Sequence, residues 1–368
     1  MIKSLPLNKI KPGMVVADYV FPANLSQPVV HPNTLLTDDV INKLRLHRIN
    51  SIPVDIDEEF MIREKILPEV KPMLDAGLRT EADNSIRRLF QVVVAGSSEE
   101  NYTTAHQIVK ELDTVVDQLV DTLETNPNEL VRIADLKSYD DYTYNHSLSV
   151  AVLSIAIGQS MGASPEMLRL LGRSAIMHDI GKMFVPLEIL NKPARLTDSE
   201  FTVMKSHPKY GYDYLVAGDI GDEIIRMGVL QHHEKIDGSG YPDGLAGDNI
   251  PIPSNIISVA DVYDAVTSYR SYRTPMAPAD AIELIMSSVG TAFEYDVVKA
   301  FLDKLELYPV NTCVELSNKR IGIVLDNISF MRPVLSMLDT GEVVDLMDRK
   351  NLSLVITRVL DGLFPTSE

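Results

Sequence analysis

The chain has 368 residues, more than one minimal domain needs, and this length predicts two or three domains. Acidic residues outnumber basic ones by 52 to 34. The formal net charge of −18 argues against a general nucleic-acid-binding protein, because such proteins need clustered Lys and Arg. The single cysteine, Cys313, excludes an intramolecular disulfide framework and a cysteine-rich zinc site.

Residues 1–65 predict a small N-terminal α+β module. Thr37 is a favourable N-cap for a short helix whose apolar positions, Val40, Ile41 and Leu44, keep helical spacing. Residues 51–56, with the sequence SIPVDI, predict a strand that closes the module. A packing or regulatory role without chemistry is the expectation for this module.

Residues 66–130 predict a helical connecting segment. Apolar residues recur at i, i+3 and i+4 between residues 105 and 123, which is typical of an amphipathic helix. Residues 99–141 contain 11 acids and three bases, and we interpret this run as a solvated helix face.

Residues 131–308 contain long helical patterns separated by Gly- and Pro-rich loops. Residues 309–368 predict a β-rich segment with a hairpin that turns near Ser317 and Asn318. Further strands are predicted within residues 333–339, 342–348 and 352–360.

Five of the eight histidines lie between residues 146 and 233, interleaved with acids in short polar interruptions of apolar helices. One histidine on a helix is more often structural than a ligand, but a cluster of this kind is different. A buried imidazole beside a buried carboxylate is costly unless both have partners, and a metal ion supplies a partner to each. The five are His146, His178, His207, His232 and His233.

Two acidic positions fit the same interpretation. Asp179 follows His178 directly, so its carboxylate can share a metal cluster best by spanning two ions. Asp261 and Asp264 stand at i and i+3, on one face of a predicted helix. His and carboxylate ligands suit Fe, Mn or Zn, and two metals a few Å apart are a common device for displacement at phosphorus.

Three cations could hold a phosphate. Lys182 follows Asp179 by three residues and is expected to face the same pocket as a point charge. Arg270 and Arg273 lie one turn apart after Asp264, although a plain surface position at a helix end fits them equally well.

Three segments together resemble the HD-GYP phosphodiesterases, a bacterial subgroup of the HD superfamily. They are HDIGK at 178–182, HHEKIDGSGYPDG at 232–244 and ADVYDAVTSYRSYR at 260–273. The resemblance covers roughly residues 131–330 and implies an all-helical catalytic bundle at residues 131–308. The expected fold class is therefore α+β and multidomain, with this bundle flanked by the N-terminal module and the C-terminal β segment.

The resemblance also assigns roles. Metal binding falls to His146, His178, Asp179, His207, His232, His233 and Asp261. Asp179 and Lys182 would be catalytic, with Asp179 bridging two metals. Lys182, Arg270, Arg273 and Tyr241 would bind substrate, and Asp264 would orient a ligand from behind. The GYP loop comprises Gly238, Gly240, Tyr241 and Pro242.

Such enzymes hydrolyse cyclic di-GMP to pGpG, and in some members onward to GMP, through a metal-bridging hydroxide. The expected cofactors are two divalent ions, Fe or Mn first, with Ni or Zn as alternatives. A third metal is in doubt, because Tyr142 stands where some members have a glutamate ligand.

Two other functions stay open: hydrolysis of another cyclic dinucleotide such as cyclic GMP-AMP, and a low-turnover sensor that binds cyclic di-GMP. The resemblance further implies a contact between the GYP loop and diguanylate cyclases, and a homodimer is one assembly left open. Since the sequence shows neither a signal peptide nor a long apolar run, we expect a cytoplasmic protein without a membrane span and without a nucleic-acid partner.

Overall fold

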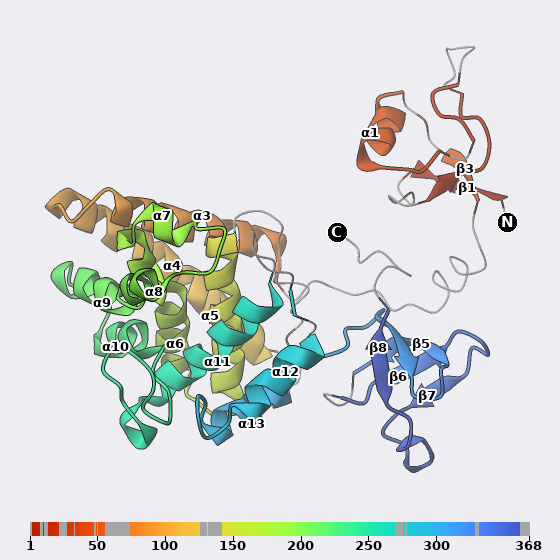
Figure 1. Cartoon of the computed structure of the whole chain (residues 1–368). Coiled ribbons are helices and arrows are strands. Elements are labelled where there is room, and N and C mark those ends of the chain that lie inside the picture. Colours follow the sequence, from red (N-terminus) through yellow and green to blue (C-terminus); the bar gives the residue numbers. More distant parts are fainter. Residues whose placement is uncertain are drawn as a thin grey trace. The chain divides into compact units, whose positions relative to one another are not determined.

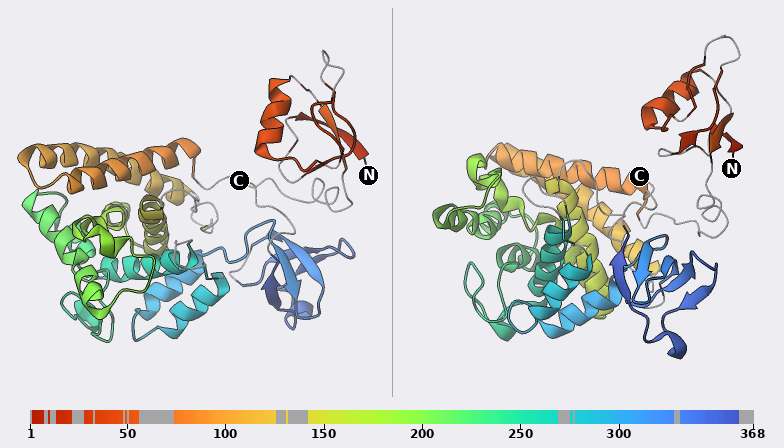
Figure 2. Two further views of the ribbon diagram at one scale, coloured as in Figure 1. Left: turned by 45° about the horizontal axis from the view of Figure 1, so that its top comes forward. Right: turned by 45° about the vertical axis from the view of Figure 1, so that its right-hand side comes forward.

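The structure is a computed structural model of the chain (Figures 1 and 2). It describes residues 2–7, 10, 14–21, 28–32, 34–47, 49, 51–55, 74–125, 131, 142–268, 275–276, 278–327 and 331–360. These fall into two compact units: residues 71–309 with 327–332, and residues 1–70 with 310–326 and 333–368.

The N-terminal module is a three-stranded antiparallel sheet with one helix. Its strands are β1 (Ile2–Pro6), β2 (Val15–Val16) and β3 (Ser51–Asp55), in the order β1-β3-β2. Helix α1 (Asp38–Leu46) begins where the Thr37 hydroxyl accepts the N–H of Val40 at 3.4 Å. Leu44 of this helix is fully buried in the same cluster as Ile52 of β3. The predicted N-cap and closing strand are confirmed.

The C-terminal segment is a five-stranded antiparallel sheet in the order β7-β6-β5-β4-β8. The predicted hairpin is confirmed, since the turn at Ser317 and Asn318 joins β4 to β5. The three further predicted strands are present too. The elements are β4 (Cys313–Leu316), β5 (Ile321–Asp326), β6 (Val334–Met337), β7 (Val343–Asp345), the 3-10 helix η5 (Arg349–Asn351) and β8 (Ile356–Val359).

The other unit is helical. It begins with α3 (Ala76–Val94) and α4 (Glu99–Thr125), which pack against each other. The helices that follow are α5 (Tyr142–Ser160), α6 (Pro165–Met177), η3 (Ile180–Phe184), α7 (Leu187–Leu190), α8 (Asp198–Met204), α9 (His207–Ala217), α10 (Glu223–Gln231), η4 (Gly247–Asn249), α11 (Ile252–Thr267), α12 (Pro278–Ser287) and α13 (Tyr295–Lys304).

Helix α5 forms the centre of this unit. Every residue from 146 to 158 is buried, because the sequence is apolar or small on all sides of the helix. The helix packs against α6, α11 and α13, and Figure 1 shows it running through the middle of the bundle. His146 is therefore the first residue of the buried stretch of this helix.

The amphipathic helix predicted at residues 105–123 is confirmed, and α4 extends beyond these residues at both ends. Its buried residues are Ala105, Ile108, Leu112, Val115, Val116, Leu119, Val120 and Leu123.

The interpretation of its acidic run as a solvated face is wrong for three acids, which pair with arginines of α6. Arg169 lies 3.0 Å from Asp117 and 3.2 Å from Asp121, and Arg173 lies 2.7 Å from Asp113 and 3.7 Å from Asp117. The arginines come about 50 residues later in the chain, so the run alone did not reveal them.

Two glycines let η3 approach α9 closely. A Cβ atom on Gly181 would stand 1.9 Å from the carbonyl oxygen of His207 and 2.5 Å from the amide nitrogen of Gly211. Only a residue without a side chain fits there. This contact holds the start of α9 beside the residues that precede η3.

Candidate metal centre

Three histidines lie just past the ends of three helices. His178 is the C-cap of α6, His232 is the C-cap of α10, and His207 follows the end of α8 by three residues. The last carbonyls of a helix have no partner inside it, and here one of them accepts Nδ1–H from the imidazole three residues later. The pairs are His178 with Ala175 at 2.7 Å, His207 with Met204 at 2.8 Å and His232 with Val229 at 2.8 Å.

These contacts fix which nitrogen of each ring bonds the helix. A carbonyl oxygen only accepts, so each Nδ1 carries a proton and each Nε2 is left to face other groups. The three Nε2 atoms all come within 3.9 Å of the Asp179 carboxylate. The negative ends of the helix dipoles also favour positive charge at this point.

Asp179 lies between two groups of histidines. Its Oδ2 atom is 3.3 Å from Nε2 of His178 and 3.7 Å from Nε2 of His146. Its Oδ1 atom is 3.3 Å from Nε2 of His207 and 3.9 Å from Nε2 of His232. His178 and Asp179 are not neighbours within one helix, as the sequence suggests. They lie at the junction of α6 and η3. Each carboxylate oxygen thus faces a different group.

Helix α11 places its two acids on opposite nitrogens of His146. Oδ1 of Asp261 is 3.1 Å from Nε2, and Oδ2 of Asp264 is 2.7 Å from Nδ1. Both acids are buried, as the predicted common face requires. Asp261 therefore reaches the centre, while Asp264 contacts the imidazole from behind.

His233 completes the second group. Its ring centroid lies 4.2 Å from that of His232 and 5.0 Å from that of His207. It also stacks on Tyr241 at 4.7 Å between ring centroids, with an interplanar angle of 29°. The GYP loop thus reaches the centre through Tyr241.

Burial and charge act on the pKa values of this cluster. Burial and the neighbouring imidazoles lower the pKa of His232 well below its usual value and that of His233 to about 3. Burial opposes charge on His146 too, but the Asp261 and Asp264 carboxylates outweigh it and raise the pKa to about 9. Burial also disfavours ionised Asp179, yet the positive charges of His178 and Lys182 keep its pKa well below the usual value.

The donor set fits divalent metal ions. Within the described part of the chain, Nε2 of His178 and Oδ1 of Asp179 are buried without a hydrogen-bond partner, which is costly unless another group binds them. Among the described residues there are three groups of three donor residues, and within each group the ligand atoms lie within 4.8 Å of one another. They are His146, His178 and Asp179; His207, His232 and His233; and His178, His232 and Asp261. Imidazole and carboxylate suit Fe, Mn, Ni or Zn.

Lys182 supplies a positive charge at the edge of the centre. Its Nζ atom is 2.5 Å from Oδ2 of Asp179, and about a fifth of the side chain is exposed. The predicted orientation toward the pocket is therefore seen. Arg270 and Arg273 lie outside the described residues, and so does the side chain of Tyr142 at the start of α5.

The structure adds one residue that sequence reasoning missed. Glu234 is buried and its carboxylate binds backbone N–H groups on the far side of the GYP loop. The only sequence signal was a glutamate directly after two ligand-type histidines and ahead of a glycine-rich loop.

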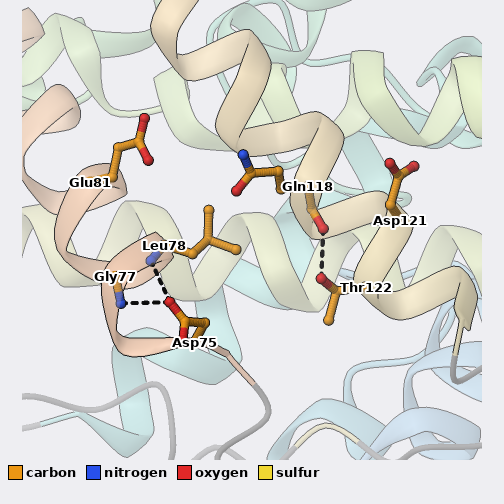
Figure 3. A pocket seen from close by; sticks show the side chains of 7 residues that line it. All are labelled: Asp75, Gly77, Leu78, Glu81, Gln118, Asp121 and Thr122. Carbon is orange, nitrogen blue, oxygen red and sulfur yellow. Dashed lines mark hydrogen bonds between the residues drawn. The ribbon is translucent and has the colours of Figure 1, made fainter.

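A separate cavity of about 550 Å³ opens between the start of α3 and the last turns of α4. Figure 3 shows its lining, in which Asp75 accepts the N–H groups of Gly77 and Leu78. The lining residues described include none of the histidines or acids of the candidate centre. The cavity is therefore a distinct feature of the α3–α4 hairpin.

Known proteins resemble this chain over the candidate centre and beyond it. The family model described as HD domain matches residues 126–297. The cyclic di-GMP phosphodiesterase PA4108 of Pseudomonas aeruginosa is 31% identical over 342 residues, which cover 89% of this chain and 82% of that protein. No helix in the described part of the chain is long and apolar enough to cross a membrane.

Other relatives match a smaller part of the chain. A cyclic di-GMP phosphodiesterase of Thermotoga maritima is 41% identical over 175 residues, 46% of this chain and 47% of that protein. The 3'3'-cGAMP-specific phosphodiesterase 1 of Vibrio cholerae is 36% identical over 161 residues, 44% of this chain and 37% of that protein. The chain thus spans most of the Pseudomonas protein and less than half of these two.

Proposed function

The chain belongs to the HD-GYP family of the HD superfamily, and from this premise we propose that it is a metal-dependent phosphodiesterase that hydrolyses cyclic di-GMP. The observation that carries the proposal is Asp179, whose two carboxylate oxygens each face a different group of imidazoles. A relative that spans most of the chain is named for this activity.

We propose that two divalent ions occupy the centre, Fe or Mn in the first place and Ni or Zn as alternatives. His146, His178 and Asp261 would hold one ion, His207, His232 and His233 the other, and Asp179 both. Such ions supply an activated water and neutralise charge on a phosphodiester. No carboxylate at position 142 adds to the set, so we do not propose a third ion.

The protein's own groups would then position the substrate. In the described part of the chain, Lys182 is the cationic side chain beside Asp179. Its ammonium group can bind a non-bridging phosphate oxygen. Tyr241 offers a flat ring against which a nucleotide can pack. Arg270 and Arg273 stay predictions for the second phosphate.

Anaerobic purification with metal analysis, followed by product identification from cyclic di-GMP, tests the proposal. His178→Ala and Asp179→Asn should each lose metal and turnover together, because each removes a donor from the centre. His106→Ala is the matched control, since this histidine bonds the Gly218 carbonyl away from the centre. Turnover that survives either ligand change would refute the site, and no turnover by metal-loaded wild type would refute the activity.

A second substrate has support of its own. The Vibrio cholerae relative named for cyclic GMP-AMP is 36% identical to this chain over 161 residues, close to the 35% over 211 residues of a Vibrio cholerae relative named for cyclic di-GMP. A panel of cyclic di-GMP, cyclic GMP-AMP and cyclic di-AMP under one metal condition would rank them by kcat/KM. The same assay separates pGpG from GMP as the end product.

The remaining expectations about partners are proposals as well. A contact between the GYP loop and a diguanylate cyclase, a homodimer and a cytoplasmic location all stay predictions from the family resemblance. The loop offers an exposed segment at residues 242–244 for such a contact. Light scattering of the metal-loaded protein would decide the assembly state.

A further inference from the structure

Glu234 is a buried acid with an unusual set of partners. Its side chain is 1% exposed, and its carboxylate accepts three successive backbone N–H groups. Oε1 binds Asp243 at 2.7 Å and Gly244 at 3.1 Å, and Oε2 binds Leu245 at 3.0 Å. A row of N–H groups of this kind is a binding site for an anion, and here the chain supplies the anion itself.

These bonds close the GYP loop. Glu234 lies before the GYP loop and Asp243 directly after it, so the carboxylate ties the two flanks of the loop together. The N–H of Tyr241 also bonds the carbonyl of His233 at 3.2 Å. Gly240 fits against the same backbone, because a Cβ atom there would stand 2.5 Å from Cα of Glu234.

The closed loop determines where Tyr241 lies. Its ring stacks on His233, the residue directly before Glu234, at 4.7 Å between centroids. His233 has no carbonyl contact of the kind that fixes the rings of His178, His207 and His232 among the described bonds. The stacked tyrosine therefore restrains this imidazole together with the rings of His207 and His232.

We propose that Glu234 is a positioning residue: its carboxylate holds the GYP loop in the form that stacks Tyr241 on His233 and orients both toward the metal centre. The inference rests on the proposed phosphodiesterase activity, which it deepens. The described bonds of the Glu234 carboxylate are to backbone N–H groups, so it acts through the loop.

Two variants weaken the hydrogen bonds of the Glu234 carboxylate to different degrees. Glu234→Ala removes all three acceptors. Glu234→Gln keeps one oxygen, which can still accept from Asp243 and Gly244, but its amide cannot accept from Leu245. Because residues 243 and 244 are exposed, water can bind their N–H groups in the alanine variant, and we expect a loosened loop in a folded protein.

The measurements are amide hydrogen exchange at residues 243–245, Mn²⁺ affinity, and kcat and KM in the full-length protein. For Glu234→Ala we expect lost protection of these amides, Mn²⁺ affinity weakened by up to about tenfold, and kcat/KM lowered by about tenfold or more through KM. Glu234→Gln should fall between this variant and wild type in all three.

Asp75→Ala is the matched control, because Asp75 also accepts two backbone N–H groups but at the start of α3, where Figure 3 shows it. It should leave kcat/KM unchanged. Lost amide protection in Glu234→Ala with wild-type KM and Mn²⁺ affinity would overturn the proposal, as would protection that survives the change. If metal-loaded wild type hydrolyses no cyclic dinucleotide, the proposed activity fails, and amide exchange with Mn²⁺ affinity still decides the role of Glu234.

Discussion

The two ring nitrogens of His146 each contact a carboxylate, and both carboxylates come from helix α11. Asp261 and Asp264 were predicted to share a face of α11 from their spacing alone, and both reach this imidazole. Their roles differ, because Asp261 contacts the nitrogen that faces the centre and Asp264 the nitrogen behind it. A carboxylate behind a ligand histidine orients the ring and raises its basicity.

Asp264→Asn should therefore weaken metal binding without removing a ligand. The amide keeps the shape of the side chain but not its charge, and we expect about a 10- to 100-fold loss of Mn²⁺ affinity. Titration of the metal-free protein measures this. Asp213→Asn, which changes an exposed acid paired with Lys209 on α9, should bind Mn²⁺ like wild type. Equal affinity in both variants would contradict the role of Asp264.

Within the candidate centre, sequence reasoning found the side chains that meet each other but not the contacts between side chains and backbone. The histidines and acids stood out because their residue types are unusual inside apolar helices. Glu234 did not, since its partners are main-chain N–H groups of residues whose identity says nothing about such bonds. For the same reason, the carbonyl of Ala175 behind His178 became visible only in the structure.

At the scale of elements, the contact between η3 and α9 depends on a missing side chain. Gly181→Ala would place a methyl group against the backbone of α9, which cannot move aside as a side chain can. We expect a loss of about 1–3 kcal/mol in the free energy of unfolding together with weaker metal binding, because His207 begins this helix.

Gly158→Ala is the control for that change. Its new methyl group would press on the ends of the Leu168 and Leu171 side chains rather than on backbone, and side-chain ends yield more readily. Thermal unfolding and Mn²⁺ titration of both variants check the expectation. A Gly181→Ala protein with wild-type stability and metal affinity would show that η3 and α9 can separate without harm.

The ion pairs between α4 and α6 have unequal effects on stability. Asp117 lies close to both Arg169 and Arg173, so Asp117→Asn should lower the free energy of unfolding by up to about 1 kcal/mol. Burial raises the pKa of Asp113; Arg173 opposes this rise and Asp117 adds to it. The charge on Asp113 is therefore unfavourable on balance, and Asp113→Asn should be at least as stable as wild type at pH 7.

The pH dependence follows from the same shift. A carboxyl group whose pKa is raised by folding costs stability above its folded pKa, and this cost disappears as the pH falls toward 3.8, its ordinary value. The advantage of Asp113→Asn should thus shrink between pH 7 and about pH 4. Urea unfolding at both values measures it, and an advantage that grows on acidification would show that the sign is wrong.

At the scale of the whole molecule, the negative net charge is known from the composition. The structure adds that a positive side chain, Lys182, lies at the candidate centre and opposes this charge locally. The formal net charge is −18, whereas Lys182 stands at the candidate centre. The mixed fold class with its helical bundle, N-terminal module and C-terminal sheet was also predictable, because turn signals and periodicity differ between these stretches. The pairing of α4 with α6 was not, since it joins residues far apart in the chain.

The net charge predicts an unusual salt response. A dianionic substrate approaching this protein is repelled at long range, and salt shortens that range from about 30 Å at 10 mM to about 10 Å at 100 mM. We therefore expect kcat/KM for cyclic di-GMP to rise with NaCl over this interval. A monoanionic phosphodiester such as bis(p-nitrophenyl) phosphate should respond less. A fall in kcat/KM would mean that local attraction dominates the encounter.

The ends of α6, α8 and α10 have a consequence for how such chains can vary in length. In each, a carbonyl of the last turn orients the histidine that follows, so an extra residue inside that turn would rotate the imidazole by about 100° away from Asp179. An extra residue before the helix, as in the exposed stretch 193–195 ahead of α8, leaves that end intact. Insertions and deletions should therefore accumulate where these helices begin and be absent where they end.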